Sequence, residues 1–227
     1  MIIAMQAIVP AFNLQESVTM KFSIQRKHIR AMLHLSAKKD VRYYLQGIHI
    51  VQDNRGTYIE ATDGHVLGRL LIEDKPFAER CSVVLPNDAL MKIKGTKKQG
   101  EEWLHFTVDG QAVQCISDDS TVRFQALENA FPDTDRIVPL VIKAEDVKPA
   151  TFNPDLLVRF VDASEDLYGK RQIPSILHRG ASAGIISFGF DDAFVGLIMP
   201  VRDDATGKVP EWCYKPSKVA QAEAVTE

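Results

Sequence analysis

A repeated order of elements constrains the fold of this chain more than any single motif does. Three times along the sequence, a strand-like run is followed by a short helix-like run and then by three further strand-like runs. Turn residues such as Asp109-Gly110 separate neighbouring strands. One such unit leaves a helix face and a sheet face without cover, so the units must pack against each other. The pattern predicts an α+β fold built from three β-α-β-β-β units.

The expected elements follow from hydrophobic spacing and from the turn or capping residues at their ends. In the first unit they are strand 20–24, helix 25–37 and strands 42–51, 57–63 and 65–72. In the second unit they are strand 81–85, helix 89–95 and strands 103–108, 112–117 and 121–126. In the third unit they are strand 150–153, helix 156–166 and strands 173–178, 184–189 and 194–200. Asn87 is the expected cap of the second helix, and Pro154 suits the first turn of the third.

Length, charge and cysteine usage exclude several classes of protein. With 227 residues, 45% of them hydrophobic, the chain is long enough to bury a core without metals or disulfides. Its net charge of −3 argues against a simple basic protein that coats nucleic acid. Cys81, Cys115 and Cys213 lie far apart with no CxxC pair, so neither a disulfide framework nor a zinc site is expected and a reducing cytoplasm fits. No motif for another metal or cofactor is recognised, and none is expected. Segment 1–19 is expected to be an extra strand or a leader. Its apolar part, 1–12, lacks the basic start of a signal peptide and is too short to span a membrane, so no membrane partner is expected.

Four short stretches stand out by their order and spacing. They are 40–47 (DVRYYLQG), 61–67 (ATDGHVL), 131–139 (FPDTDRIVP) and 197–202 (LIMPVR). Together they resemble the bacterial sliding clamp, the beta subunit of DNA polymerase III. The resemblance implies a DNA clamp fold, with antiparallel sheets outside and helices on the inner face.

The same resemblance divides the chain. It assigns 20–139 to the clamp's middle domain and 140–202 to the second half of its last domain, and it leaves 203–227 as a polar tail. The family's first domain is absent unless 1–19 is its remnant, and the first half of its last domain has no counterpart here. In the family, that missing half carries the contact that closes the ring.

The resemblance further implies a groove between these two parts, where polymerase, clamp loader and repair proteins insert a short peptide. Most matching positions are apolar, which suits the anchors of an extended peptide, although ordinary strand ends and core are the alternative. The matching residues are Leu45, Thr62, Gly64, His65, Val66, Leu67, Pro132, Arg136, Ile137, Ile198, Met199, Pro200, Val201 and Arg202. The family usually has a basic residue at Val66, so we expect an altered peptide preference.

Basic residues around the first two helices, with a tyrosine pair, match positions that hold duplex DNA in the family. Such contacts go to phosphates and carry no sequence information, as sliding requires. The residues are Arg26, Lys27, Arg30, Lys38, Lys39, Tyr43, Tyr44, Lys92 and Lys94. A solvated helix face is the alternative. The third helix is a poor DNA face because its charges are mostly acidic: Asp155, Asp162, Glu165 and Asp166.

Two functions follow from the resemblance. The first is a DNA replication processivity factor whose chains form a homo-oligomeric ring around duplex DNA. A family ring holds twelve units, so four chains of three units would close one. The second is an adaptor or decoy that binds clamp-motif peptides without a ring. A hydrolase centred on Asp63 and His65 is a formal third hypothesis, but no further catalytic motif accompanies them and no enzyme activity is expected.

Overall fold

The computed structural model describes residues 19–95, 100–128, 130–139, 142–143 and 147–201. The first unit contains β1 (Met20–Gln25), α1 (Arg26–Leu35), β2 (Gly47–Asp53), β3 (Gly56–Thr62) and β4 (Val66–Glu73). The second contains β5 (Cys81–Pro86), α2 (Asn87–Leu90), β6 (Trp103–Asp109), β7 (Ala112–Ile116) and β8 (Thr121–Gln125). The third contains α3 (Pro154–Tyr168), β9 (Ser175–Leu177), β10 (Gly184–Phe188) and β11 (Asp191–Ile198). Two short 3-10 helices, η1 (Tyr43–Leu45) and η3 (Thr134–Arg136), lie between these elements.

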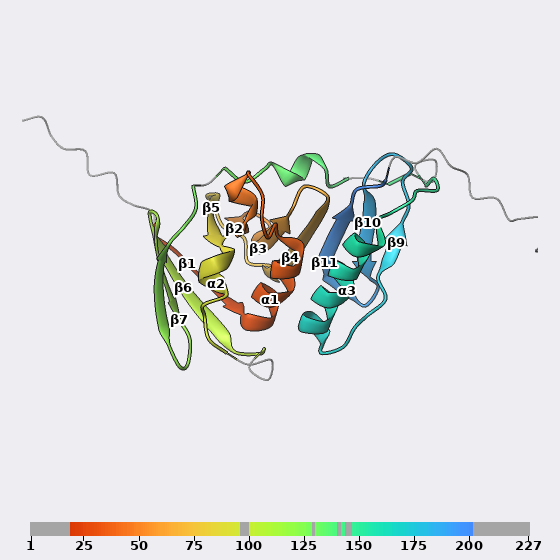
Figure 1. Cartoon of the computed structure of the whole chain (residues 1–227). Coiled ribbons are helices and arrows are strands. Elements are labelled where there is room, and N and C mark those ends of the chain that lie inside the picture. Colours follow the sequence, from red (N-terminus) through yellow and green to blue (C-terminus); the bar gives the residue numbers. More distant parts are fainter. Residues whose placement is uncertain (1–18, 96–99, 129, 140–141, 144–146, 202–227) are drawn as a thin grey trace, which may run out of the picture.

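The strands form two antiparallel sheets, which confirms the predicted α+β fold (Figure 1). A four-stranded sheet has the order β1-β6-β7-β8. A seven-stranded sheet has the order β5-β2-β3-β4-β11-β10-β9. The first two units therefore exchange their leading strands, since β1 pairs with β6 and β5 pairs with β2. This exchange explains why neither unit is complete without the other.

One predicted strand boundary and one predicted strand are wrong. Residues 43–45, expected at the start of a strand, form η1, because the side chain of Leu45 turns into the core and is only 1% exposed. The strand expected at 150–153 is reduced to a single bridge between Thr151 and Val201. The third unit therefore contributes three strands to the sheet, and its leading segment only touches the end of β11.

The second predicted helix is also shorter than expected. The spacing predicted a helix over 89–95 capped by Asn87, whereas α2 has four residues and begins after Pro86. The side chain of Asn87 is buried, and its Nδ2 donates to Ser36 Oγ at 2.9 Å and to Ala37 O at 3.0 Å. Asn87 thus ties α2 to the end of α1 instead of capping its own helix.

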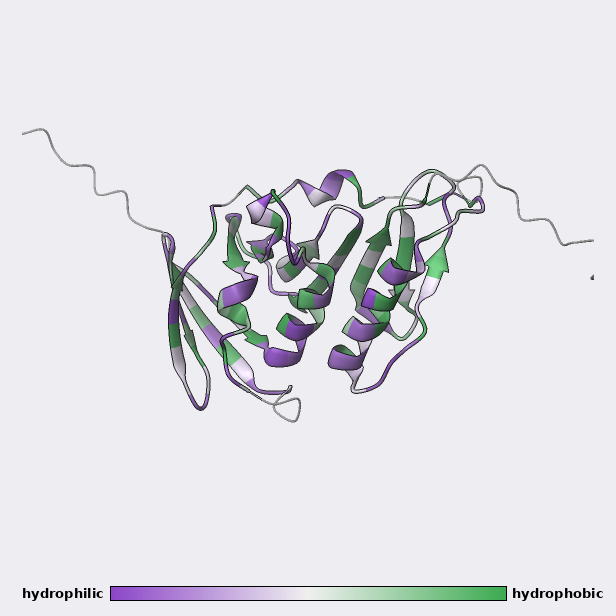
Figure 2. Ribbon diagram, in the orientation of Figure 1, coloured by the Kyte–Doolittle hydropathy of each residue, from purple (hydrophilic) through white to green (hydrophobic). Residues whose placement is uncertain are grey.

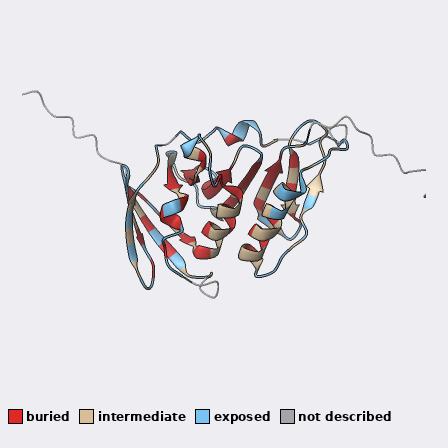
Figure 3. Cartoon of the chain, viewed as in Figure 1, coloured by how far each residue is buried: buried red, intermediate tan, exposed pale blue. Residues whose placement is uncertain are grey.

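One strand pairing joins the third unit to the first. β11 runs antiparallel to β4, from Ile198 opposite Val66 to Phe194 opposite Leu70, and we call this pairing the seam. Against the seam, α1 and α3 lie side by side on one face of the seven-stranded sheet (Figure 1). The two sheets' central strands and these helices carry most of the buried apolar residues (Figures 2 and 3).

Two glycines let the helices approach the seam. Gly68 of β4 and Gly196 of β11 face each other in the ladder. A Cβ atom at Gly68 would lie 2.2 Å from Leu35 Cδ1 of α1, and one at Gly196 would lie 2.5 Å from Phe160 Cε1 of α3. Both distances are far below van der Waals contact, so the close packing of helix on sheet depends on the absence of side chains here.

The third helix begins and ends at residues suited to those positions. Asn153 Oδ1 accepts a hydrogen bond from Asp155 N at 2.9 Å, and Pro154 occupies the first turn as predicted. Gly169 ends the helix with φ of 75°, a left-handed conformation that glycine adopts without strain. Phe160, Ala163 and Leu167 of this helix are among its buried residues. Within the described part of the chain, no helix is long and apolar enough to cross a membrane.

Candidate functional site

A cavity of about 240 Å³ lies at one end of the seam. Its walls come from η1, the turn between β3 and β4, the segment 131–137 and the ends of β10 and β11, and we call it the seam groove. Apolar side chains predominate in its lining. The lining residues are Arg42, Leu45, Thr62, Gly64, His65, Val66, Leu67, Pro132, Asp133, Thr134, Ile137, Ala183, Leu197 and Met199.

The turn between β3 and β4 is fixed by hydrogen bonds from its own side chains. Thr62 Oγ1 donates to Val66 O at 2.5 Å and accepts from Gly64 N at 3.0 Å. Asp63 Oδ1 accepts from two backbone amides, His65 N at 2.8 Å and Val66 N at 2.9 Å. Gly64 has φ of 93°, which a residue with a side chain rarely adopts. This part of the groove therefore has one well-determined shape before any ligand arrives.

Arg42 braces the same turn from the side of η1. Its Nε and Nη2 donate to the two carboxylate oxygens of Asp40, at 3.0 Å and 2.7 Å. Nη2 also donates to Asp63 O at 3.1 Å. A Cβ atom at Gly64 would lie 3.0 Å from this nitrogen, so glycine leaves room for the guanidinium. An Arg42–Asp40 ion pair consequently lies at the rim of the groove.

The segment 131–137 forms a second wall and is anchored to the sheet beneath it. Thr134 Oγ1 donates to Glu60 Oε1 at 2.6 Å and accepts from Arg69 Nη2 at 2.9 Å. Phe131 stacks on the ring of His49, with 4.5 Å between centroids. These partners belong to β2, β3 and β4, so the position of the wall depends on polar side chains of the sheet.

Glu60 lies at the centre of this anchor and is only 1% exposed. It accepts from Arg69 Nε at 2.7 Å, and its other oxygen contacts His49 Nδ1 at 3.0 Å. Burial by itself raises the pKa of Glu60, but the hydrogen bond from His49 and the charge of Arg69 outweigh that effect and leave the pKa below its usual value. The carboxylate is therefore held in its charged form.

Asp135 links the same wall to two arginines and gives it a predicted pH dependence. Hydrogen bonds from Arg55 Nη1 at 2.7 Å and Arg69 Nη2 at 2.8 Å lower the pKa of Asp135 from 3.8 to about 2. Because the pKa is lower in the folded state, the stabilisation is present above pH 4 and is lost as the pH falls toward 2. We expect the melting temperature of Asp135→Asn to lie below that of the wild type at pH 6 and to converge with it near pH 2.

Thermal unfolding followed by circular dichroism between pH 2 and 7 measures this difference. Asp133→Asn, which removes a carboxylate paired with Arg136 in the same segment, is the control. A gap between wild type and Asp135→Asn that stays constant over the whole pH range would contradict the assignment.

The opposite wall comes from the end of β11. Leu197 is buried, and Met199, which follows the strand, is 45% exposed. Met199 N donates to His65 O at 2.8 Å, so the backbone continues the seam by one further hydrogen bond. An exposed methionine beside buried aliphatic side chains offers an adaptable apolar surface.

Nine of the predicted groove residues are brought together by the fold. They are Leu45, Thr62, Gly64, His65, Val66, Leu67, Pro132, Ile137 and Met199. Arg136, Ile198, Pro200 and Val201 do not line the cavity: Ile198 is fully buried in the seam, and Arg136 is exposed and donates to Asp133. Arg202 lies outside the described residues. Peptide binding by this set stays a prediction.

Five lining residues were missed by the sequence analysis. Arg42, Asp133, Thr134 and Leu197 lie inside the stretches that carry the resemblance, so their spacing was an available signal. Ala183 had no signal, because it lies in a loop before β10 and its place in the groove depends on the tertiary fold.

Arg26 is a correction to the predicted DNA-binding set. Its side chain is buried, with Nε donating to Glu102 Oε2 at 2.8 Å and Nη1 donating to Ile93 O at 2.9 Å. A guanidinium committed in this way holds α1 against the loop before β6, and it does not face solvent or a phosphate.

The other predicted DNA contacts divide into paired and exposed groups. Lys27 Nζ lies 2.7 Å from Glu101, and Arg30 Nε lies 3.3 Å from Asp166. Tyr43 is 46% exposed and donates to Glu128, while Tyr44 is partly buried. The exposed lysines are Lys38, Lys39, Lys92 and Lys94. DNA contact by these residues stays a prediction.

The geometry at Asp63 and His65 argues against the hydrolase hypothesis. One carboxylate oxygen of Asp63 accepts from two backbone amides, and the other is paired with Arg159. Both carboxylate oxygens of Asp63 are thus engaged by other groups. Among the described residues, no group of three or more histidine, cysteine or acidic side chains is placed to hold a metal ion.

Comparison with known proteins points to one family. A family model described as the DNA polymerase III beta subunit, central domain, matches residues 13–133. The beta sliding clamp of Pseudomonas aeruginosa is 24% identical over 127 residues, which cover 53% of this chain and 34% of that protein. The beta sliding clamp of Buchnera aphidicola is 28% identical over 114 residues, which cover 48% of this chain and 30% of that protein. The match thus spans about a third of the length of these relatives.

Solved structures agree with the fold. The beta subunit from DNA polymerase of Streptococcus pyogenes superposes with a TM-score of 0.63 at 16% identity, covering 88% of this chain and 68% of that one. The DNA polymerase sliding clamp from Bacillus subtilis gives a TM-score of 0.62 at 17% identity, covering 81% of this chain and 64% of that one. The similarity in structure extends beyond the residues that the sequence comparisons match.

Proposed function

This chain belongs to the DNA polymerase III beta subunit family, and from that premise we propose that its seam groove binds extended peptides of replication and repair proteins. The proposed partners are clamp-motif segments of DNA polymerase, of the clamp loader and of repair proteins. The protein would act in DNA replication by holding such partners, without an enzymatic step of its own.

The observation that carries this proposal is an apolar groove whose walls are already fixed. The turn between β3 and β4, the anchored segment 131–137 and the end of β11 each keep their place through hydrogen bonds within the chain. Preformed walls reduce the ordering that binding requires, which favours affinity from a small contact area. Side-chain pockets of this kind suit the alternating anchors of an extended peptide.

Met199 supplies the direct test of the groove. We expect Met199→Ala to weaken peptide binding about tenfold, because truncation removes an exposed apolar contact from the wall at the end of β11. The measurement is fluorescence polarisation with a labelled clamp-motif peptide of a bacterial replicative polymerase. A peptide with its aliphatic and aromatic anchors replaced by alanine should not bind.

Met91→Ala is the matched control for this substitution. Met91 is 63% exposed and lies just beyond α2, away from the seam groove. Its truncation should leave the affinity unchanged. Equal affinities of wild type and Met199→Ala, or absence of binding by the wild type, would rule out the proposed groove function.

A second proposed function is encirclement of duplex DNA by several chains, and the exposed Lys38, Lys39, Lys92 and Lys94 favour it. In this proposal, 20–139 is one clamp domain and 140–202 is half of another. Light scattering at micromolar concentration tests it. A ring predicts a defined oligomer, whereas a monodisperse monomer without DNA or loader would leave the ring-less adaptor or decoy.

A further inference from the structure

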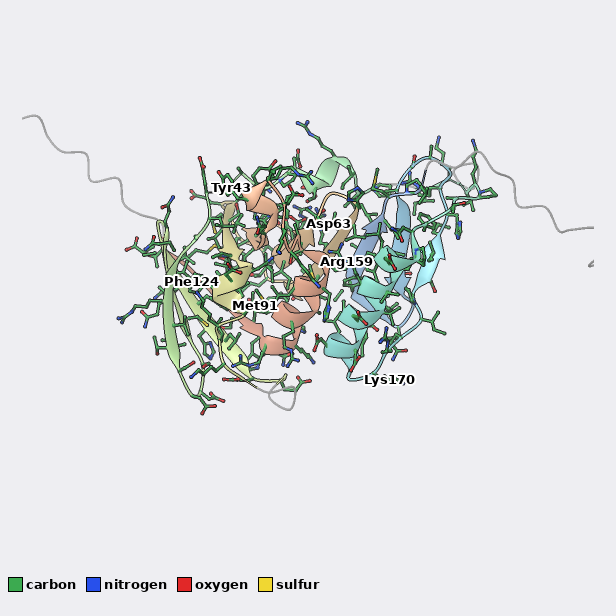
Figure 4. The ribbon with its side chains drawn as sticks, in the orientation of Figure 1. Tyr43, Asp63, Met91, Phe124, Arg159 and Lys170 are labelled. Carbon is green, nitrogen blue, oxygen red and sulfur yellow. The ribbon has the colours of Figure 1, made fainter. Side chains whose placement is uncertain are left out.

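Arg159 of α3 makes contacts that no helix-packing argument requires. Its Nη1 forms an ion pair with Asp63 Oδ2, its Nε donates to His34 O at 2.6 Å, and its Nη2 donates to Ser36 O at 3.0 Å. The Arg159 side chain is 21% exposed, and Figure 4 places it beside Asp63 between α1 and α3. Three nitrogens of one planar group thus hold three acceptors in a fixed geometry.

Two of these acceptors belong to the end of α1. The last carbonyl groups of a helix have no partners within the helix and carry the negative end of its dipole. Arg159 satisfies the carbonyls of His34 and Ser36 with a charged donor. The arginine therefore fixes the end of α1 relative to α3.

The third acceptor, Asp63, belongs to the turn between β3 and β4, whose other residues line the seam groove. Asp63 shares its carboxylate between two tasks: Oδ2 faces Arg159, while Oδ1 accepts from the amides of His65 and Val66. The Asp63 side chain is only 18% exposed. Without Arg159, this partly buried carboxylate would lose its ion pair, and rotation of the carboxylate toward water would compete with its two amide hydrogen bonds.

We propose that Arg159 is a positioning residue for the seam groove, which it shapes through Asp63 from the opposite side of the seam. The expected effect on peptide binding rests on the proposed function, because a displaced turn can weaken binding only if the groove binds peptides. The effect of Arg159 on the turn itself does not depend on the proposed function, because it concerns hydrogen bonds of the free protein. Arg159 itself lines no part of the cavity.

Hydrogen exchange of the free protein tests the structural part. In Arg159→Met, we expect the amides of His65 and Val66 to exchange about tenfold faster than in the wild type, because opening of the turn becomes easier. Asp166→Asn is the matched control: Asp166 also joins α3 to α1, through His34 Nε2 at 2.9 Å, and it is not among the residues that line the seam groove. In this control, the same two amides should keep their wild-type exchange rates.

Peptide binding and a double substitution complete the test. Arg159→Met should weaken binding of the clamp-motif peptide about fivefold, and Asp166→Asn should leave it unchanged. Arg159→Lys should have an intermediate effect, because one ammonium group cannot reproduce the planar arrangement of donors in the guanidinium. Asp63→Asn combined with Arg159→Met should be no worse than Asp63→Asn alone, since both act through one contact.

The outcomes separate this inference from the proposed function. Equal acceleration of exchange in Arg159→Met and Asp166→Asn would reduce Arg159 to a helix-packing residue and overturn the inference. Additive effects of Asp63→Asn and Arg159→Met would do the same. If the wild type binds no peptide while exchange changes as expected, the groove function fails and the positioning role of Arg159 stands.

Discussion

Glu60→Ala is expected to lower the free energy of unfolding by about 3–5 kcal/mol, because it breaks a buried ion pair and removes an acceptor shared by three side chains. Arg69 would lose its buried carboxylate, and the ring of His49 would lose its partner at Nδ1. Thr134 would lose the acceptor of its hydroxyl, which anchors the segment 131–137. The same substitution should therefore weaken peptide binding as well as stability.

Urea unfolding monitored by fluorescence and circular dichroism measures the change in free energy. Glu73→Ala, at the exposed end of the neighbouring strand β4, is the control and should change stability little. Glu60→Gln keeps the shape of the side chain without its charge and should fall between the wild type and Glu60→Ala. A loss no larger than that of Glu73→Ala would show that the anchor contributes nothing.

Gly196→Ala is expected to destabilise the protein by about 2 kcal/mol through overpacking at the seam. The new methyl group would lie 2.5 Å from Phe160 Cε1 and 2.9 Å from Ile186 Cβ. Phe160 and Ile186 are both fully buried, so neither can move away into solvent. Relief requires that α3 shift away from β11, which would also alter the wall that ends in Met199.

Gly189→Ala provides the matched comparison for this prediction. A Cβ atom at Gly189 meets no atom within 4 Å, and the residue is exposed in the turn between β10 and β11. Its replacement should change the unfolding midpoint in urea only slightly. If both alanine variants unfold at the same urea concentration, the close approach of α3 to the seam does not limit stability.

Much of the fold follows from local pattern. The strands after each helix were predicted within a few residues, because alternation and turn residues mark them directly. Tyr43–Leu45 was misassigned because a short run of aromatic and aliphatic residues suits a strand and a buried turn equally well. The expected strand at 150–153 failed for a different reason: a strand exists only where a neighbouring edge is available to pair with it.

The candidate site was likewise predicted only in part from the sequence. Groove residues within the four recognised stretches were predicted because they match the family in type and spacing. The fold places most of them around one cavity. The contacts that hold those residues in place were not predictable. Arg26 pairs with Glu102, and Asp63 pairs with Arg159. The partners lie far apart in the sequence, and a local sequence pattern gives no information about such contacts.

The seam also has a consequence for the order of events during synthesis. β4 precedes β11 by a long stretch of sequence, so its outer edge has no partner until β11 is made. An open edge is a site where other chains can pair, and contacts between distant segments form slowly. Since the groove needs both strands, we expect it to appear only in the last step of folding. The rate at which peptide binding appears during refolding would then measure how fast β4 pairs with β11.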